Sequence, residues 1–142
     1  QLTISIFDYL PKTAKFPPNS KAPPLPEILD GEVNFNSYNK GSNYQIGEVD
    51  VLREATIRLP MFDFPGMVVE VDNKKVSYVN NDCRNEQYCL GLITFDLPSG
   101  GHILKARLTD TPIRLTGNII SIISIALVLF LILKNYGIKK FS

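Results

Sequence analysis

Apolar and polar residues alternate along most of the chain before residue 110, as they do in strands with one buried and one exposed face. The alternation is loose in residues 32–38 and 44–52 and clear in the later segments. Those clear segments are 54–60, 67–71, 75–79, 92–97 and 102–109. About seven short strands with frequent turns between them predict a mainly β domain, an antiparallel β-sandwich.

Turn-forming residues separate these segments, at 40–43, 64–66, 72–74 and 98–101. Glycine, proline, asparagine and aspartate are the residues that adopt the backbone angles of tight turns. The last turn joins two strands of similar length. We therefore predict a hairpin there that leads directly into the segment after residue 111.

Six of the ten prolines lie between residues 11 and 26. Proline has no backbone N–H and biases the residue before it toward extended conformations. We expect residues 1–29 to form an extended, proline-rich strap or linker ahead of the β domain at 30–111. Its binding by a proline-recognition module is the alternative use. Residues 2–7 fit an edge strand or the end of a preceding element.

A long apolar run follows the predicted β domain. Residues 119–133 read IISIISIALVLFLIL, without a charge. A helix over 112–134 is roughly 34 Å long at about 1.5 Å per residue, which covers a hydrocarbon core of about 30 Å. Thr111 followed by Pro112 provides an N-cap hydroxyl and then a proline at the first helical position. We predict one C-terminal transmembrane helix, with a buried helix of a soluble protein as the alternative.

Cationic and aromatic residues flank this helix at the positions of the two lipid headgroup regions. Long basic side chains can reach from a helix end to the headgroups, and tyrosine favours the interface. The predicted interface anchors are Arg114, Lys134, Tyr136, Lys139 and Lys140. The basic tail, 135–142, has no acidic residue, so the positive-inside rule predicts a cell-membrane protein with a cytoplasmic C-terminus and an extracytoplasmic β domain.

The charge composition divides the chain in the same way. Residues 1–111 carry 11 Lys+Arg and 14 Asp+Glu, whereas residues 112–142 carry four basic residues and no acid. The overall net charge of +1 argues against a nucleic-acid partner, which would require a large basic surface. The expected partners are the lipid bilayer and neighbouring transmembrane helices.

The two cysteines, Cys83 and Cys89, lie close together in NNDCRNEQYC. In an exported domain, an even number of closely spaced cysteines predicts a disulfide that closes a small loop. Two free thiols are the alternative. A metal site is not expected, because two thiols and the one distant histidine, His102, do not complete a tetrahedral set.

No catalytic constellation is evident in the sequence. His102 is the only histidine and follows two glycines, where a partly exposed turn histidine is the ordinary interpretation. Asp63, Glu70 and Asp72 are close in sequence, and alternation places Glu70 and Asp72 on one strand face. We interpret them as solvated charges, and we expect neither a catalytic site nor a cofactor in this chain.

Small residues recur along one side of the predicted membrane helix, at Gly117, Ser121 and Ser124, with Val128 one turn further. Such a stripe allows another helix to approach closely. The nearby Asn118 offers a polar contact. We interpret the stripe as a helix-packing face.

Three segments, taken in order, carry a resemblance to a known family. They are DYLPK (8–12), FDFPGMVVEVDNKKV (62–76) and GLITFDLPSGGHILKARLTDTPIRLTGNIISIISI (91–125). Together they resemble the C-terminal end of bacterial polytopic membrane proteins described as 6-pyruvoyl-tetrahydropterin-synthase-related or YfhO-like, which look like relatives of GT-C glycosyltransferases. Asp8, Met67 and Asn73 depart from the family's usual glutamate, tryptophan and glycine.

The resemblance implies a C-terminal fragment whose catalytic region lies in a part of the parent protein that is absent here. The chain would then be a non-catalytic, accessory extracytoplasmic domain and last membrane helix of a glycosyltransferase-like protein that acts on lipid-linked sugars. The alternative is a single-pass, membrane-anchored surface adhesion or interaction module. A weaker variant is a glycan-binding module that uses exposed aromatic faces. The candidate aromatics are Tyr38, Tyr44, Phe62, Phe64, Tyr78 and Tyr88.

Overall fold

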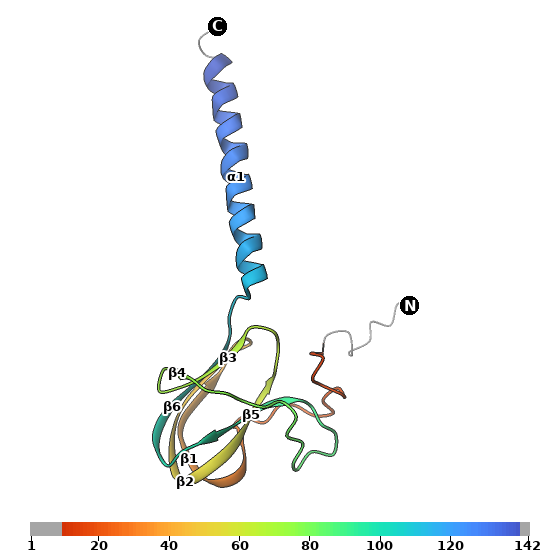
Figure 1. Ribbon diagram of the computed structural model, residues 1–142, viewed down its shortest axis with the longest axis vertical. Helices are drawn as coiled ribbons and strands as arrows, with labels where there is room; N and C mark the ends of the chain where they lie inside the picture. The colour runs from red at the N-terminus through yellow and green to blue at the C-terminus, as the bar shows by residue number, and fades with distance from the viewer. Residues whose placement is uncertain (1–9, 140–142) are drawn as a thin grey trace. The chain divides into compact units, whose positions relative to one another are not determined.

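The computed structural model describes residues 10–139 and divides the chain into two compact units, a β domain that ends at Thr109 and a helical unit that begins at Asp110 (Figure 1). The edge strand considered for residues 2–7 and the interface anchor Lys140 lie outside the described residues. Tyr136 and Lys139 fall in the last turns of the helix.

The β domain is one antiparallel sheet. Its strands are β1 (Glu27–Lys40), β2 (Tyr44–Phe62), β3 (Met67–Val71), β4 (Lys74–Lys75), β5 (Leu92–Leu97) and β6 (Gly100–Leu108). The strand order is β1-β2-β6-β3-β4, and β5 pairs with β2 outside this path. The prediction of a mainly β, antiparallel fold followed by one apolar C-terminal helix is confirmed.

The long strand β2 runs through both layers of the domain. Its first half, from Tyr44 to Val51, pairs with β6, and its second half pairs with β5. Gln45 Nε2 donates to the carbonyl of Pro60 at 3.2 Å, so the two ends of this one strand lie together. β2 therefore folds back on itself, and the predicted sandwich consists of two halves of one bent sheet.

The neighbouring strand β1 follows this bend at Gly31. The φ angle of Gly31 is 87°, which favours glycine, and a Cβ atom at this position would overlap the Glu54 carbonyl and Ala55. Irregular register between β1 and β2 on both sides of Gly31 accompanies the bend. The close approach of the two strands thus requires a residue without a side chain.

A single hydrophobic core lies between the two halves of the sheet. Alternation places its members: in β3, Met67, Val69 and Val71 are buried, whereas the two residues between them are only partly buried. Burying this apolar surface is the main driving force for folding of the domain. The buried apolar residues are Val33, Val49, Val51, Ala55, Ile57, Leu59, Met67, Val69, Val71, Ile93, Phe95, Leu97, Leu104 and Ala106.

Three local predictions are wrong. The segment 75–79 is not a strand: β4 ends at Lys75, and the chain rejoins the sheet only at Val79, through a bridge to Thr94. The segments on either side of residues 98–101 do not form a hairpin, because β5 and β6 pair with opposite halves of β2.

The third correction concerns Asp72, which does not share a strand face with Glu70. Asp72 and Asn73 are the two central residues of the turn between β3 and β4, and both have positive φ angles, 51° and 63°. This backbone geometry is that of a two-residue hairpin turn, in which asparagine and aspartate are favoured. Asn73 therefore adopts the conformation that a glycine would take at this position.

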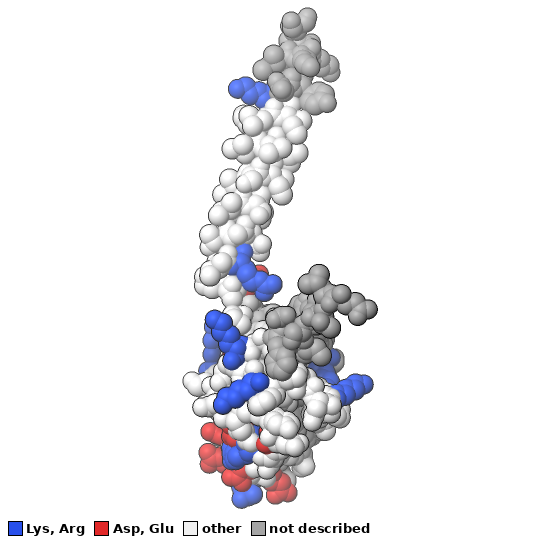
Figure 2. Space-filling view, turned by 90° about the vertical axis from the view of Figure 1, so that its right-hand side faces the viewer, with Lys and Arg blue, Asp and Glu red and all other residues white. Residues whose placement is uncertain are grey.

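The helical unit consists of α1 (Pro112–Lys139). Thr111 caps its start: the backbone N–H of Arg114 donates to Thr111 Oγ1 at 3.4 Å, and that of Leu115 donates to the Thr111 carbonyl at 3.0 Å. Residues Pro112–Lys134 are long and apolar enough to cross a membrane, and none of them is buried. In Figure 2 the helix is white between basic side chains near its two ends.

Candidate functional site

The loop between Val79 and β5 contains the cysteine pair and lies on the surface of the β domain. Cys83 and Cys89 form a disulfide, with their Cα atoms 5.0 Å apart, as predicted. The N–H of Leu90 donates to Glu86 Oε2 at 2.8 Å, inside the same loop. We name residues 80–91 the disulfide loop.

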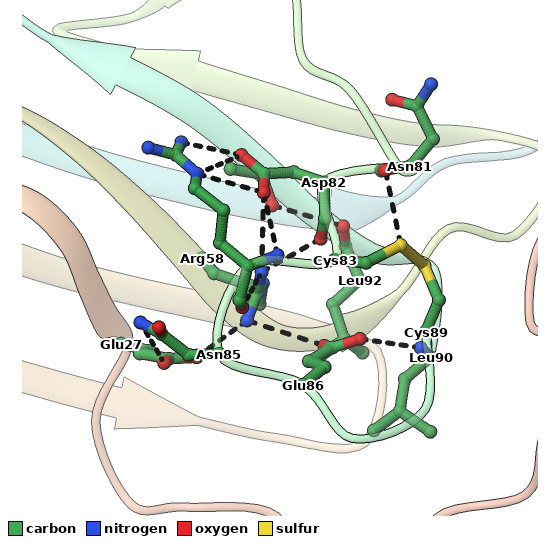
Figure 3. A network of polar contacts seen from close by, with 12 residues as sticks. Glu27, Arg58, Asn81, Asp82, Cys83, Asn85, Glu86, Cys89, Leu90 and Leu92 are labelled. Carbon is green, nitrogen blue, oxygen red and sulfur yellow. Dashed lines mark hydrogen bonds and ion pairs between the residues drawn. A yellow bond between two sulfur atoms is a disulfide. The ribbon is translucent and has the colours of Figure 1, made fainter.

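Arg58 of β2 fastens the disulfide loop to the sheet (Figure 3). Its side chain is only 1% exposed. Nη2 donates to the backbone carbonyls of Asp82 and Arg84, at 2.8 and 2.7 Å. A buried guanidinium is stable only when charge partners and hydrogen bonds compensate its lost hydration. The loop's backbone supplies two of those hydrogen bonds.

Three carboxylates surround the same guanidinium. Nη1 lies 2.9 Å from Glu27 Oε2 and 3.5 Å from Glu86 Oε1, and Nη2 lies 3.7 Å from Asp82 Oδ1. Glu27 comes from the start of β1, whereas Asp82 and Glu86 come from the disulfide loop. Arg58 therefore joins β1, β2 and the loop in one ionic cluster.

Asp82 also has a second cationic partner. The hydrogen bond from the exposed Arg84 side chain holds the pKa of Asp82 below its ordinary value, with help from the Arg84 backbone N–H and the charge of Arg58, and against a desolvation effect. Asp82 therefore stays ionised at neutral pH and is available to Arg58.

Sequence reasoning did not single out Arg58. Alternation in residues 54–60 predicts that Arg58 faces away from the core, and it does so. The disulfide loop, which is distant in sequence, covers that outer face. No local pattern identifies the partners, because Glu27 is 31 residues before Arg58 and the loop carbonyls are 24 and 26 residues after it.

The proline-rich segment contacts the disulfide loop. Phe16 and Tyr88 pack with ring centroids 4.8 Å apart. A Cβ atom at Gly91 would overlap the backbone of Thr13, so the proline-rich segment and the disulfide loop are in contact there as well. Further along, Lys40 Nζ donates to the Pro23 carbonyl at 2.6 Å. The segment 10–26 therefore lies against the β domain, without helix or strand.

His102 and Asp72 form a clamp between two turns. His102 Nδ1 lies 2.7 Å from Asp72 Oδ2, and His102 Nε2 lies 3.1 Å from the Pro98 carbonyl. Asp72 Oδ1 accepts from the Ile103 N–H at 2.9 Å. The His102 hydrogen bond is the largest cause that lowers the pKa of Asp72, followed by the Ile103 N–H. Both ring nitrogens of His102 are thus engaged in holding turns together.

The three carboxylates noted in the sequence are not brought together. Asp63 accepts from the hydroxyl of Tyr78 at 2.9 Å and from Asn80 Nδ2 at 2.7 Å. Burial, together with Asp63, raises the pKa of Tyr78 to about 12. Glu70 lies 3.4 Å from Arg107. Each carboxylate thus has its own structural partner, and the described residues contain no group of three or more His, Cys, Asp or Glu side chains able to hold a metal.

The small-residue stripe on α1 is exposed along its length. Ser121 Oγ donates to the Gly117 carbonyl at 2.9 Å, and Ser124 Oγ donates to the Ile120 carbonyl at 2.8 Å. These hydroxyls are satisfied within the helix itself. Arg114 and Lys134 lie near the two ends of the apolar segment, where the sequence places interface anchors.

Comparison of the chain with protein-family models, curated proteins and solved structures finds no match.

Proposed function

We propose that this chain is a membrane-anchored, non-catalytic positioning domain. Its β domain would lie on the extracytoplasmic side of the cell membrane, with the C-terminus of α1 in the cytoplasm. In keeping with the family resemblance, the domain would be the accessory part of a glycosyltransferase-like membrane protein that acts on lipid-linked sugars. It would hold a surface in a fixed place near the bilayer, and catalysis would belong to another part of the assembly.

The short junction between the two units is the observation that carries the proposal. Both the N–H and the Oγ1 of Thr109 donate to the Gly66 carbonyl at 2.8 Å, which fixes the last residue of the β domain. Only Asp110 and Thr111 follow before the capped helix begins at Pro112. Two residues leave little freedom for a domain to move away from the membrane, whereas a tether for free binding benefits from a longer flexible linker.

An extracytoplasmic location is supported by the disulfide, because disulfides persist in oxidising compartments. The loop that the disulfide closes is also fastened by Arg58 and presents Tyr88, which is 48% exposed. This fastened, exposed loop favours the second candidate function, a single-pass surface module that binds a glycan or a protein.

The coding sequence upstream of Gln1 separates the two functions. Several apolar stretches of about 20 residues there would support the accessory role in a polytopic protein. A signal peptide alone would contradict that role and favour the single-pass module.

A functional test then addresses positioning. In the full gene, a Gly-Ser-Gly-Ser insertion after Asp110 lengthens the junction, and the same insertion after the exposed Ser99 is the matched control. We expect the junction insertion to abolish complementation of a deletion strain, assayed as lipid-linked glycans by mass spectrometry, while the control retains it. Equal complementation by both variants would contradict a positioning role.

A further inference from the structure

The connection between β2 and β3 presents aromatic side chains in a tight turn. The N–H of Met67 donates to the Phe64 carbonyl at 2.9 Å, with Pro65 and Gly66 between them. Gly66 has a φ angle of 98°, so this is a type II turn, with proline and glycine at their preferred positions. The turn leaves Phe64 39% exposed, and its ring packs edge-on against Phe62 at 6.4 Å.

This turn is attached to the point where the chain leaves the β domain. The Gly66 carbonyl accepts both hydrogen bonds of Thr109. Pro112 is three residues further along the chain, and three extended residues span at most about 10 Å. Whatever angle α1 takes to the β domain, the turn therefore stays within short reach of the first residue of the helix.

A groove lies beside the turn. Its volume is about 400 Å³; Phe62, Phe64, Met67 and Leu108 contribute apolar side chains to its lining, and Ser42, Asn43 and Gln45 contribute polar ones. Lys40 borders it. The groove therefore combines apolar and polar side chains beside the partly exposed ring of Phe64.

Charge is distributed unevenly along the β domain. Lys40 and Arg107 occupy register positions next to Gln45 and Tyr44, at the end of the sheet where the chain leaves the domain. Acidic side chains gather at one end of the face seen in Figure 2. The register places several acidic residues around the bend of β2, away from Thr109: Asp30, Glu32, Asp50, Glu54 and Asp96.

We propose that the Phe62–Met67 turn and its groove form a bilayer-contacting surface, seated in the headgroup region of the membrane that α1 crosses. Phenylalanine side chains of surface-bound segments bury at the boundary between headgroups and acyl chains, and basic residues favour anionic headgroups. The proposal rests on membrane anchoring by α1 and is independent of the glycosyltransferase-like role. The bilayer is the chosen occupant because the chain itself holds this turn close to the start of the membrane helix.

Tryptophan fluorescence tests this surface, because the chain contains no tryptophan. We would reconstitute the full chain with Phe64→Trp in phosphatidylcholine vesicles with and without bromine-labelled acyl chains. Leu52→Trp is the matched control: Leu52 is 58% exposed and lies at the bend of β2, roughly 30 Å from Thr109 along β6. Leu127→Trp, within α1, reports whether the helix is inserted.

We expect blue-shifted emission and strong quenching for the Phe64 and Leu127 variants, and neither effect for the Leu52 variant. Phosphatidylglycerol should increase the quenching of Phe64→Trp, and Lys40→Glu should reduce that increase. Quenching at Leu127 without quenching at Phe64 would overturn the proposed surface while leaving the anchor in place. An unquenched Leu127 variant would overturn both. Blue-shifted but unquenched emission at Phe64 would mean that the side chain is buried within the β domain or against a second copy of the chain, and would overturn the bilayer contact.

Discussion

The β domain and α1 satisfy their polar groups and place their apolar residues in opposite ways. In the β domain, apolar side chains turn inward, and a buried guanidinium depends on partners that are far away in sequence. In α1, apolar side chains face outward, and the serine hydroxyls bond to carbonyls four residues earlier in the same helix. The β domain is therefore stabilised by long-range contacts, whereas the helix is locally complete and depends on an apolar surrounding.

The largest expected effect is at the long-range contacts of the β domain. Replacing Arg58 by methionine leaves Asp82 and Glu86 without their buried cation and removes the hydrogen bonds to the loop carbonyls. We expect the free energy of unfolding to fall by about 3–5 kcal/mol, the usual loss when one partner of a buried ion pair is removed. Urea denaturation of the full chain in detergent micelles, followed by circular dichroism, measures the change.

Arg53→Met is the matched control for Arg58→Met, because Arg53 is an exposed arginine on the same strand. We expect its effect on stability to stay within about 0.5 kcal/mol. Equal losses for the two variants would show that the buried cluster does not hold the disulfide loop.

The membrane insertion of α1 should respond to a charged residue in its apolar segment, because the helix depends on an apolar surrounding. An arginine in place of Leu127, near the middle of the apolar segment, costs about 2.5–3.5 kcal/mol of insertion free energy. We expect Leu127→Arg to shift the chain from the membrane fraction to the soluble fraction, with the β domain still folded, and Leu127→Ala to remain in the membrane. Carbonate extraction and sedimentation measure this distribution. Recovery of both the wild-type chain and Leu127→Ala in the soluble fraction would contradict a transmembrane α1.

The disulfide should contribute less than Arg58, because it closes only a small loop. Loop-closure entropy gives about 2 kcal/mol for a ring of this size. Replacing both Cys83 and Cys89 by serine should lower stability by about that amount, and the loop should keep its place while Arg58 holds its backbone carbonyls. Combining this change with Arg58→Met measures the coupling. Strictly additive losses would mean that the two attachments act independently.

These contrasts also explain how much the sequence could predict. The strand at 67–71, the helix from 112 and the cysteine pair depend on local patterns, and each was recognised from neighbouring residues. The fold-back of β2 was not, because residues 44–52 and 54–60 were interpreted as separate strands. The bend follows only from the pairing of the two halves of β2 with different strands and from the contact between Gln45 and Pro60. The place of β5 and β6 in different layers likewise depends on their partners in β2.

The two candidate surfaces likewise differ from the local elements, because their roles depend on contacts between residues that are far apart in sequence. Arg58 lies in an ordinary alternating strand, and the residues that bury it are distant in sequence, so local reasoning could not find its role. Residues 64–66 of the Phe62–Met67 turn were predicted as a turn from their sequence. The closeness of this turn to the start of the membrane helix follows only from the two hydrogen bonds between Thr109 and Gly66.

The smallest expected effect is a dependence of stability on pH, which the β domain should show and the helix should not. The pKa of Asp72 is lowered from its ordinary value of 3.8, chiefly by the hydrogen bond with His102. A carboxyl group with a depressed pKa in the folded state stabilises the fold above its unfolded pKa, and this stabilisation is lost as the pH falls through the folded value. Because Asp72 is largely exposed, we expect it to contribute less than about 1 kcal/mol.

Asp72→Asn should therefore reduce the stability of the β domain at pH 6 and leave it nearly unchanged at pH values well below 4, relative to the wild type. Asp110→Asn, an exposed aspartate in the junction, is the control and should show no such difference. The segment Pro112–Lys134 contains no acidic residue, so its helicity in vesicles should not change across the same range. A loss for Asp72→Asn that is equally large at both pH values would show that the clamp acts through the shape of the turn and not through the charge of the carboxylate.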